Sequence, residues 1–420
     1  MLFKRDIEVL VAGAGPVGLV AGLALTRRNI RVQLIDEQYR TSARSYALAL
    51  HPRSLELMEE LGLAEELLAK GHKVETLAFY DGAARRAEVS FGKLKGRYPF
   101  LLVLSQQVLE ESLERHLEER GVEVQWNHRL SSLALNGIAN ATLERLVKES
   151  AGYSVARTEW VVDKELTARV PYVIGADGHR STVRRKLGIP FDAVGPSQLF
   201  AVFEFATDRP QGAEARVILS GGKTSVLWPI GPNYCRFSFQ VDESDVVETA
   251  RAKSRLAVVL GESSFDYLKP ELLSRLMGER APWFDGKVTE LAWSLAVRFE
   301  RRAAKPFGRS NVWLAGDSAH LSAPMASWSM NAGVREACDL AQRLEGLLRK
   351  SAPREVLEEL GEAQERAWRA MVEARCDAGA STDPWVKEHA RAIFDCLPAT
   401  GRDLAPLLAQ LGLAWGGGPS

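Results

Sequence analysis

The chain has 420 residues, 46% of them hydrophobic, which is enough for two intimately packed domains, with one large domain as the alternative. Its 54 Lys and Arg balance 54 Asp and Glu, which excludes a global charge that would attract nucleic acid or an anionic membrane. The four cysteines form no C-x-x-C pair, so we expect neither a metal site nor disulfides, and a cytoplasmic location. Glycines interrupt the N-terminal apolar run, so we expect no signal peptide and no membrane span.

The segment IEVLVAGAGPVGLVAGLAL, residues 7–25, predicts a buried strand, a glycine turn and a helix. Gly13 permits a tight turn, Gly15 lets the backbone approach a pyrophosphate, and Gly18 lets the helix pack closely on the strand. The next strand, in IRVQLIDEQ, ends in Asp36, whose carboxylate can accept hydrogen bonds from an adenosine ribose. This context predicts dinucleotide binding, with a glycine-rich turn of an unrelated α/β protein as the alternative.

Two later segments identify the dinucleotide. YVIGADGHRSTVRRKLG places Asp177 after an apolar strand, and RSNVWLAGDSAH repeats the theme with Gly316 and Asp317. In this order and spacing, the three segments resemble the single-component (group A) flavin-dependent aromatic hydroxylases, which are p-hydroxybenzoate hydroxylase-like FAD monooxygenases. The resemblance implies bound FAD, NADH or NADPH as transient reductant, and O2. It further implies hydroxylation of an aromatic or polycyclic substrate through a flavin C4a-hydroperoxide.

The resemblance also assigns roles to single residues. It implies that Arg44 contacts the FAD phosphate, although a solvated loop arginine is the alternative, and that Asp317 binds the ribityl chain. Gln106 is assigned to the flavin side, with Gln107 as the contact if the register slips, while His320 is assigned a structural role. The expected cofactor-binding residues are Gly13, Gly15, Pro16, Gly18, Asp36, Glu37, Arg44, Gln106, Leu130, Asp177, Gly316, Asp317, Pro324, Met330 and Asn331.

Between these segments, LFAVFEF, ARVILS, TSVLWPIG and YCRFSFQV predict antiparallel strands with one covered face. The expected fold is α/β: a Rossmann-like FAD domain of glutathione-reductase-type topology, a mixed antiparallel-sheet substrate domain and C-terminal helices. We expect the discontinuous FAD domain in 1–72, 99–180 and 305–350, the substrate domain in 73–98 and 181–304, and a helical segment in 351–420. Residues 134–167 look like a polar excursion. Trp228 is expected in the substrate pocket, with an ordinary core position as the alternative.

The segment GDSAHLSAPMASWSMNAG, residues 316–333, departs from the resemblance, which implies a proline followed by closely spaced glycines. Here Ala326, Ser327 and Ser329 take glycine positions. Either the loop keeps its course with negative φ angles while Trp328 walls the substrate pocket, which we favour, or it is displaced. Because the loop is altered, a flavin oxidoreductase that inserts no oxygen is an alternative function. A non-catalytic FAD-binding protein is a third alternative, and the substrate could be a small aromatic molecule or an aromatic side chain on a peptide.

Overall fold

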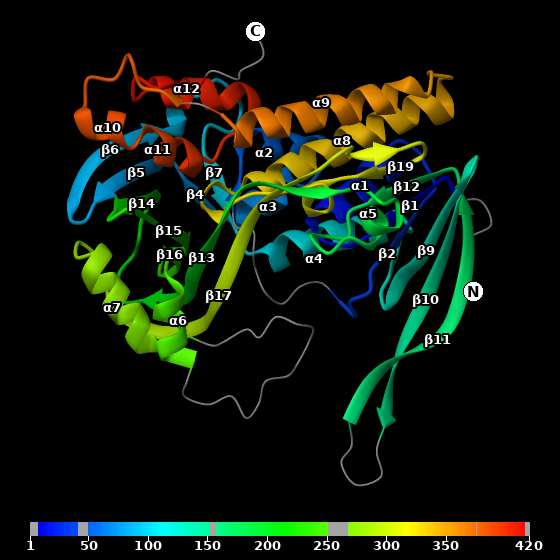
Figure 1. Cartoon of the computed structure of the whole chain (residues 1–420), viewed down its shortest axis with the longest axis horizontal. Coiled ribbons are helices and arrows are strands. Elements are labelled where there is room, and N and C mark those ends of the chain that lie inside the picture. Colours follow the sequence, from blue (N-terminus) through cyan, green and yellow to red (C-terminus); the bar gives the residue numbers. More distant parts are fainter. Residues whose placement is uncertain (1–6, 41–48, 152–156, 251–267, 375, 416–420) are drawn as a thin grey trace.

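The computed structural model describes residues 7–40, 49–151, 157–250, 268–374 and 376–415. A six-stranded sheet forms one half of the molecule (Figure 1), with the order β18-β19-β12-β1-β2-β8. Its strands are β1 (Val9–Ala12), β2 (Val32–Ile35), β8 (Val124–Gln125), β12 (Tyr172–Gly175), β18 (Gly308–Arg309) and β19 (Val312–Leu314). Every pair in it is parallel except β18 with β19. A mostly parallel sheet of this kind confirms the expected α/β class.

Helices cover one face of this sheet, whereas its other face packs against residues within 128–170 and 182–186. The four residues of β1 are all buried, and α1 (Pro16–Thr26), which follows it directly, packs between α4 (Gln106–Glu118) and α8 (Trp328–Arg349). Three leucines on one face of α4, Leu109, Leu113 and Leu117, are buried. Helix α8 runs beside α9 (Glu355–Val372). The predicted strand, turn and helix of the first segment are thus confirmed.

An eight-stranded sheet forms the second half, in the order β20-β17-β13-β16-β15-β14-β5-β6. The bounds are β5 (Thr76–Asp81), β6 (Ala84–Ser90), β13 (Phe191–Thr207), β14 (Glu214–Ser220), β15 (Lys223–Gly231), β16 (Tyr234–Gln240), β17 (Val288–Ala304) and β20 (His320–Leu321). The four predicted strands fall within β13 to β16, and each neighbouring pair among them is antiparallel. Because β5 pairs with β14 in parallel, the sheet is mixed, as expected.

The expectation of one covered face on this sheet is wrong. Phe203, Phe205 and Phe237 lie in a buried cluster against α7 (Pro270–Arg280), while Trp228 and Val202 belong to the large core on the opposite face. Strand β13 is continuously buried from 200 to 205 because its only polar side chain in that run, Glu204, is paired within the fold. A nearly continuous apolar run indicates burial on both faces, and period-two alternation does not describe it.

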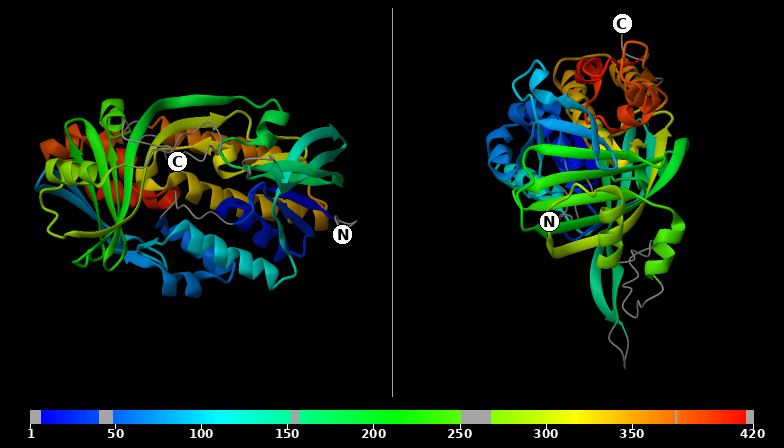
Figure 2. Two further views of the ribbon diagram at one scale, coloured as in Figure 1. Left: turned by 90° about the horizontal axis from the view of Figure 1, so that it is seen from below. Right: turned by 90° about the vertical axis from the view of Figure 1, so that its left-hand side faces the viewer.

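The polar segment around 134–167 folds as an arm of three antiparallel strands, β9 (His128–Asn136), β10 (Ile138–Ala151) and β11 (Arg157–Val170). Figure 2 shows this arm at the end of the molecule opposite to the eight-stranded sheet. Where the arm meets the body, Leu130, Ala139 and Val170 are buried in the core. Farther along the arm, Trp160 and Val162 are exposed.

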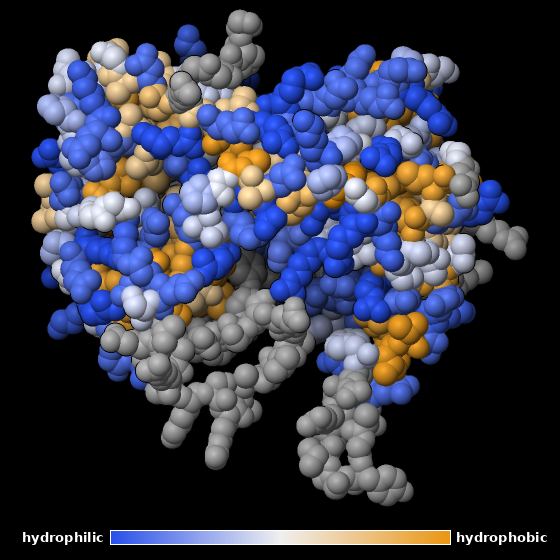
Figure 3. Space-filling model, viewed as in Figure 1, coloured by the Kyte–Doolittle hydropathy of each residue, from blue (hydrophilic) through white to orange (hydrophobic). Residues whose placement is uncertain are grey.

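The remaining elements are short. They are β3 (Ala49–Leu50), β4 (His72–Val74), β7 (Leu101–Val103), β21 (Cys376–Asp377), β22 (Ala414–Trp415), α2 (Pro52–Glu60), α3 (Ala64–Lys70), α5 (Thr182–Lys186), α6 (Glu243–Ala250), α10 (Pro384–Glu388), α11 (Ala390–Cys396) and α12 (Leu404–Ala409), with single 3-10 turns at Phe91–Lys93, Gly316–Ser318, Pro324–Ala326 and Gly401–Asp403. Hydrophilic residues cover most of the face in Figure 3, and apolar residues appear there in separate patches. Among the residues described, none of the helices has the length and apolar character to cross a bilayer.

Candidate flavin site and adjoining pocket

The three segments that carry the family resemblance, around Gly13, Asp177 and Asp317, meet at the carboxyl ends of neighbouring parallel strands. Strand β12 lies between β1 and β19, so the turn after each strand opens at the same edge of the sheet. The amide of Ala176 donates to the carbonyl of Ala12 at 2.7 Å, and the amide of Ala315 donates to the carbonyl of Gly175 at 3.0 Å. In open α/β sheets, ligands bind at this edge, outside the strand ends.

The first glycine turn is shaped for a phosphate. Gly13 has a φ of 104°, and a Cβ there would lie 2.2 Å from the carbonyl oxygen of Ala176, so the turn needs glycine. A Cβ on Gly15, by contrast, would meet no atom within 4 Å, because this residue faces open space. Helix α1 begins there with Pro16 at its first position and no side-chain cap. An uncapped helix N-terminus with open space beside its glycine suits an anion such as a pyrophosphate.

Asp36 holds the glycine turn from the end of β2. Its Oδ2 accepts a 2.6 Å hydrogen bond from the amide of Ala14, and its Oδ1 accepts from the amide of Gln38. Burial raises the pKa of the Asp36 carboxyl, and these two amides oppose that shift. The neighbouring Glu37 also has a raised pKa, because of burial and then the charge of Asp36. The Asp36 carboxylate contacts the turn, and a carboxylate at this position can accept a hydrogen bond from a ribose hydroxyl.

Asp177 binds the first turn of the short helix α5, whose N-cap is Ser181. One carboxylate oxygen accepts from the amides of Thr182 at 2.7 Å and Val183 at 3.0 Å, while the other accepts the Ser181 hydroxyl at 2.5 Å. Burial raises the pKa of Asp177 against these hydrogen bonds. Gly178, with a φ of 73°, would present a Cβ to open space. The carboxylate therefore shapes the turn at Asp177 and Gly178, here called the DG turn. The backbone at Gly178 is open to a ligand.

The segment that contains Gly316 and Asp317, here called the GD segment, combines an exposed carboxylate, Asp317, with a buried pair, His320 and Glu336. Asp317 is exposed, and its Oδ1 accepts a 2.6 Å hydrogen bond from the Ser329 hydroxyl. Below it, the ring of His320 donates through Nε2 to Glu336 at 2.8 Å and stacks on Trp368 at a centroid distance of 3.9 Å. Burial opposes ionisation of Glu336, yet His320 keeps the pKa of this carboxyl below its usual value. His320 therefore has a structural setting, as the resemblance implied.

The altered loop turns through Ser327. This residue has a φ of 52°, so the expectation that Ala326, Ser327 and Ser329 all follow negative φ angles is wrong at Ser327. A left-handed residue is needed because the 3-10 turn Pro324–Ala326 runs directly into α8 without an intervening linker. Ala326 and Ser329 have no positive φ. One serine thus takes the conformation that glycine would adopt most easily.

Asn331 and His51 clamp this loop to the segment before α2. The Asn331 side chain accepts from the amide of His51 and donates to the carbonyls of Ala49 and Ser327, each at 2.8 Å. Nε2 of His51 donates to the carbonyl of Ala326 at 2.8 Å. Because Ala49, His51, Ala326 and Asn331 are buried, the loop has little freedom to move away from residues 49–51.

The other expected cofactor residues differ in how far they are exposed to solvent. Gln106 is half-buried and donates to Glu110, whereas Gln107 is exposed. Leu130 and Met330 are buried in the core, so only their backbones could contact a cofactor. Arg44 lies outside the described residues.

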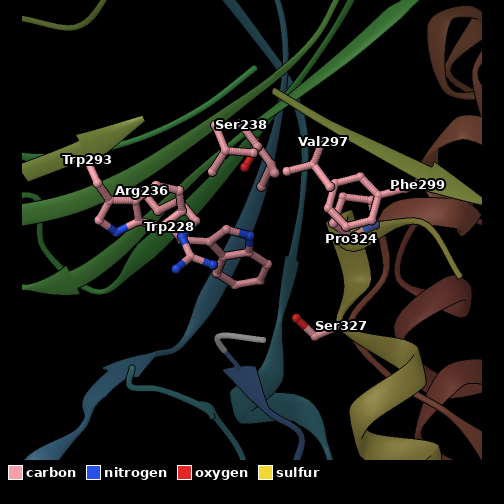
Figure 4. Close-up of a pocket in the computed structure, with 10 residues that line it drawn as sticks. Trp228, Arg236, Ser238, Trp293, Val297, Phe299, Pro324 and Ser327 are labelled. Atoms are coloured by element: carbon pink, nitrogen blue, oxygen red, sulfur yellow. The ribbon is translucent and has the colours of Figure 1, made fainter. Parts of the chain in front are cut away.

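A pocket lies between the inner face of the eight-stranded sheet and the altered loop (Figure 4). Pro324 and Ser327 border it on the loop side, and Trp228, which was expected there, lines the sheet side. Trp328 is placed elsewhere: its indole packs against Phe394, and its Nε1 donates to the carbonyl of Leu397 at 2.8 Å. The ten lining residues are Val202, Val226, Trp228, Arg236, Ser238, Trp293, Val297, Phe299, Pro324 and Ser327.

Two residues of the site, Glu204 and Ser329, received no role from the sequence. Glu204 lies between Arg236 and Trp293 on the same face of the sheet and binds both, although it does not line the pocket. Its signal was present, because it is the single charge in LFAVFEF, and the facing strand YCRFSFQV likewise carries one charge, Arg236. Ser329 had no such signal, since its contact with Asp317 depends on how the loop folds back.

Among the described residues, no group of three or more His, Cys, Asp or Glu side chains could hold a metal ion. FAD fits this geometry better than a metal ion does. The open glycine turn suits the phosphates, the two carboxylates after β2 suit the ribose, and the exposed Asp317 suits the ribityl chain. The donor set at this edge is therefore that of a dinucleotide site.

The comparisons with known proteins agree with this class of site. The model of the family described as "FAD binding domain" matches residues 6–375, and the chain belongs to this family. It is 31% identical over 355 residues to 6-methylpretetramide 4-monooxygenase of Streptomyces rimosus, covering 84% of this chain and 58% of that protein. It is 28% identical over 359 residues to pentachlorophenol 4-monooxygenase of Sphingobium chlorophenolicum, covering 84% and 61%.

The fold matches that of p-nitrophenol 4-monooxygenase PnpA from Pseudomonas putida DLL-E4, with a TM-score of 0.73 and 22% identity over 97% of each chain. This likeness confirms the expected architecture. The chain spans about three fifths of the length of the two curated relatives above, 58% and 61%.

Proposed function

We propose that the protein is an FAD-dependent monooxygenase that uses NADH or NADPH and O2 to hydroxylate an aromatic or polycyclic compound. The relatives named above are monooxygenases of a pretetramide and of pentachlorophenol, which supports oxygen insertion over a flavin oxidoreductase without it. FAD supplies the oxygen chemistry when bound.

The observation that carries this proposal is the continuity between pocket and flavin segments. Ser327 borders the pocket, and two residues later Ser329 contacts Asp317 of the GD segment. One short loop therefore separates a pocket lined by two tryptophans and a phenylalanine from the expected ribityl partner. An aromatic compound in this pocket would lie beside the cofactor.

The chain itself positions groups and excludes water. Asp36 and Asp177 fix the turns that follow β1 and β12, while Asn331 and His51 hold the loop that borders the pocket. Trp228, Trp293 and Phe299 provide flat apolar walls for an aromatic ring. A rigid, largely apolar wall orients the ring and keeps solvent from the reacting atoms.

Two further features belong to the proposal. Cytoplasmic location is supported by the four cysteines, which are all free thiols. A free small molecule is favoured as substrate over an aromatic side chain on a peptide, because the pocket lies between sheet and loop and is bordered by buried side chains.

The test is product analysis with labelled oxygen. The yellow holoenzyme is reduced anaerobically with NADH or NADPH, mixed with 18O2 and a panel of phenols and polycyclic aromatics, and the products are analysed by mass spectrometry. Incorporation of one labelled oxygen atom per product supports the proposal. Reduction followed only by hydrogen peroxide across the panel would instead support an oxidoreductase that inserts no oxygen, and a protein that retains no FAD would contradict both.

A further inference from the structure

Four side chains form a row across the pocket wall. Trp228 pairs in register with Arg236, Arg236 with Glu204, and Glu204 with Trp293, across strands β15, β16, β13 and β17. Residues in register on adjacent strands project to the same face, so the row lies on the face toward the pocket. Trp228, Arg236 and Trp293 line the pocket directly, as Figure 4 shows.

The charges in this row neutralise each other. Arg236 and Glu204 have side chains that are 4% and 7% exposed, and they form an ion pair in which Nε, at 2.7 Å, and Nη2 of the guanidinium both donate to Oε1 of Glu204. Glu204 also accepts the indole N–H of Trp293 at 2.7 Å and the hydroxyl of Tyr234 at 3.2 Å. Both oxygens of this carboxylate accept hydrogen bonds, and its negative charge compensates the positive charge of the buried guanidinium.

Arg236 is the only charged side chain among the ten described residues that line the pocket. Its guanidinium lies over the Trp293 ring, 5.2 Å from the centroid, so the cation contributes a flat surface to the wall. An anionic ligand at this wall would have to displace Glu204 or lie close to it without a counter-ion of its own. Either arrangement carries a large desolvation penalty.

Resting on the proposed function, we infer that the pocket selects aromatic compounds whose buried part is uncharged, such as neutral phenols or quinones, and rejects aryl carboxylates. Glu204 is the specificity-determining residue, although it does not line the pocket itself. It acts by occupying the guanidinium that would otherwise bind an anion. Specificity of this kind arises because binding of the wrong ligand, here an anion beside Glu204, is energetically unfavourable.

The experiment compares two ligands with the same bicyclic ring, 2-naphthol and 2-naphthoate, by calorimetric titration of the FAD-bound protein at pH 7. We expect naphthol to bind at least about tenfold more tightly than naphthoate. Equal binding, or tighter binding of naphthoate, overturns the inference but leaves the proposed function intact. If neither ligand binds, the aromatic pocket itself is wrong, which counts against the proposed function as well.

The Glu204→Gln variant sharpens this test, because it leaves the buried guanidinium without a counter-charge. We expect its affinity for naphthoate to rise at least about tenfold above that of the wild type, and naphthoate to raise its melting temperature more than naphthol does. Unchanged naphthoate affinity in folded Glu204→Gln overturns the role of Glu204. Asp285→Asn, which breaks the exposed pair with Arg209, is the matched control and should leave both affinities unchanged.

A second variant guards against failure of Glu204→Gln to fold. Glu204→Gln combined with Arg236→Met removes both charges, so no unpaired charge remains buried. We expect this double variant to fold and to keep the preference for naphthol. A double variant that binds naphthoate more tightly than naphthol would overturn the inference, because no guanidinium would then explain the anion binding.

Discussion

The hydroxyl of Ser329 lies 2.6 Å from Oδ1 of Asp317 and donates a hydrogen bond to it. A glycine at position 329 could not make this contact, so the altered loop supplies a side-chain partner to the carboxylate expected to bind the ribityl chain. The hydrogen bond fixes the direction of an exposed carboxylate before any cofactor arrives. A preorganised acceptor loses less conformational entropy on binding.

We expect Asp317→Ala to weaken FAD retention far more than His320→Ala, whereas His320→Ala should be the more destabilising change. Asp317 is exposed, so its loss should cost the apoprotein at most about 0.5 kcal/mol. His320→Ala leaves the buried Glu336 carboxylate without its imidazole partner, which should cost about 3–5 kcal/mol. Equilibrium dialysis of FAD and urea unfolding of the apoprotein measure the two effects. Equal losses of FAD would contradict the role of Asp317.

We expect Ser327→Gly to be neutral or to stabilise the protein by up to about 1 kcal/mol, because glycine adopts the left-handed φ of 52° without strain. The matched control is Ala326→Gly in the same loop, where φ is not positive. That change should destabilise by about 0.5–1 kcal/mol. Urea unfolding gives both free energies, and a loss of stability in Ser327→Gly as large as in Ala326→Gly would argue against strain at this position.

His51 should make the stability of the protein sensitive to acid. Burial lowers the pKa of its imidazole to about 4, so the folded state holds it neutral while the unfolded chain protonates it near pH 6.5. The stabilising contribution is therefore complete above pH 6.5 and is lost as the pH falls toward 4. Between pH 7 and 4.5 it should diminish by about 2–3 kcal/mol.

The variant His51→Gln tests this linkage, because glutamine keeps a donor for the carbonyl of Ala326 but has no charge to gain. Urea unfolding at pH 7 and at pH 4.5 should show a smaller acid-induced loss of stability in the variant than in the wild type. Equal losses in both proteins would mean that protonation of His51 does not accompany unfolding.

Trp228, in the pocket wall, and Trp328, beside Phe394, should respond differently to replacement by phenylalanine. Trp228→Phe reduces the pocket wall, and we expect the affinity for 2-naphthol to fall by about 2–10-fold. Trp328→Phe removes the hydrogen bond to the carbonyl of Leu397 and should cost about 1 kcal/mol of stability without changing that affinity. Calorimetry and urea unfolding distinguish the two outcomes, and a loss of naphthol affinity in Trp328→Phe would return this residue to the pocket.

The sequence alone determined the parts of the site that depend on local spacing. Gly13, Gly15 and Gly18 follow a buried strand and open a helix, and the DG and GD segments each follow another apolar strand. Because parallel strands of one sheet end at one edge, these three turns were bound to meet. The α/β class, the mixed second sheet and the family follow from the same pattern and are confirmed. The domain boundaries and the individual cofactor contacts stay predictions.

Only the tertiary structure decided how the altered loop and the pocket wall are built. The left-handed turn at Ser327 follows from the junction between a 3-10 turn and α8, which no local preference of serine indicates. The indole of Trp328 turns toward Phe394 because the C-terminal helices offer a buried carbonyl there, and Glu204 meets Arg236 because their strands pair in one register. Such contacts join residues distant in the chain, so their geometry is set by packing and strand pairing, which are properties of the whole fold.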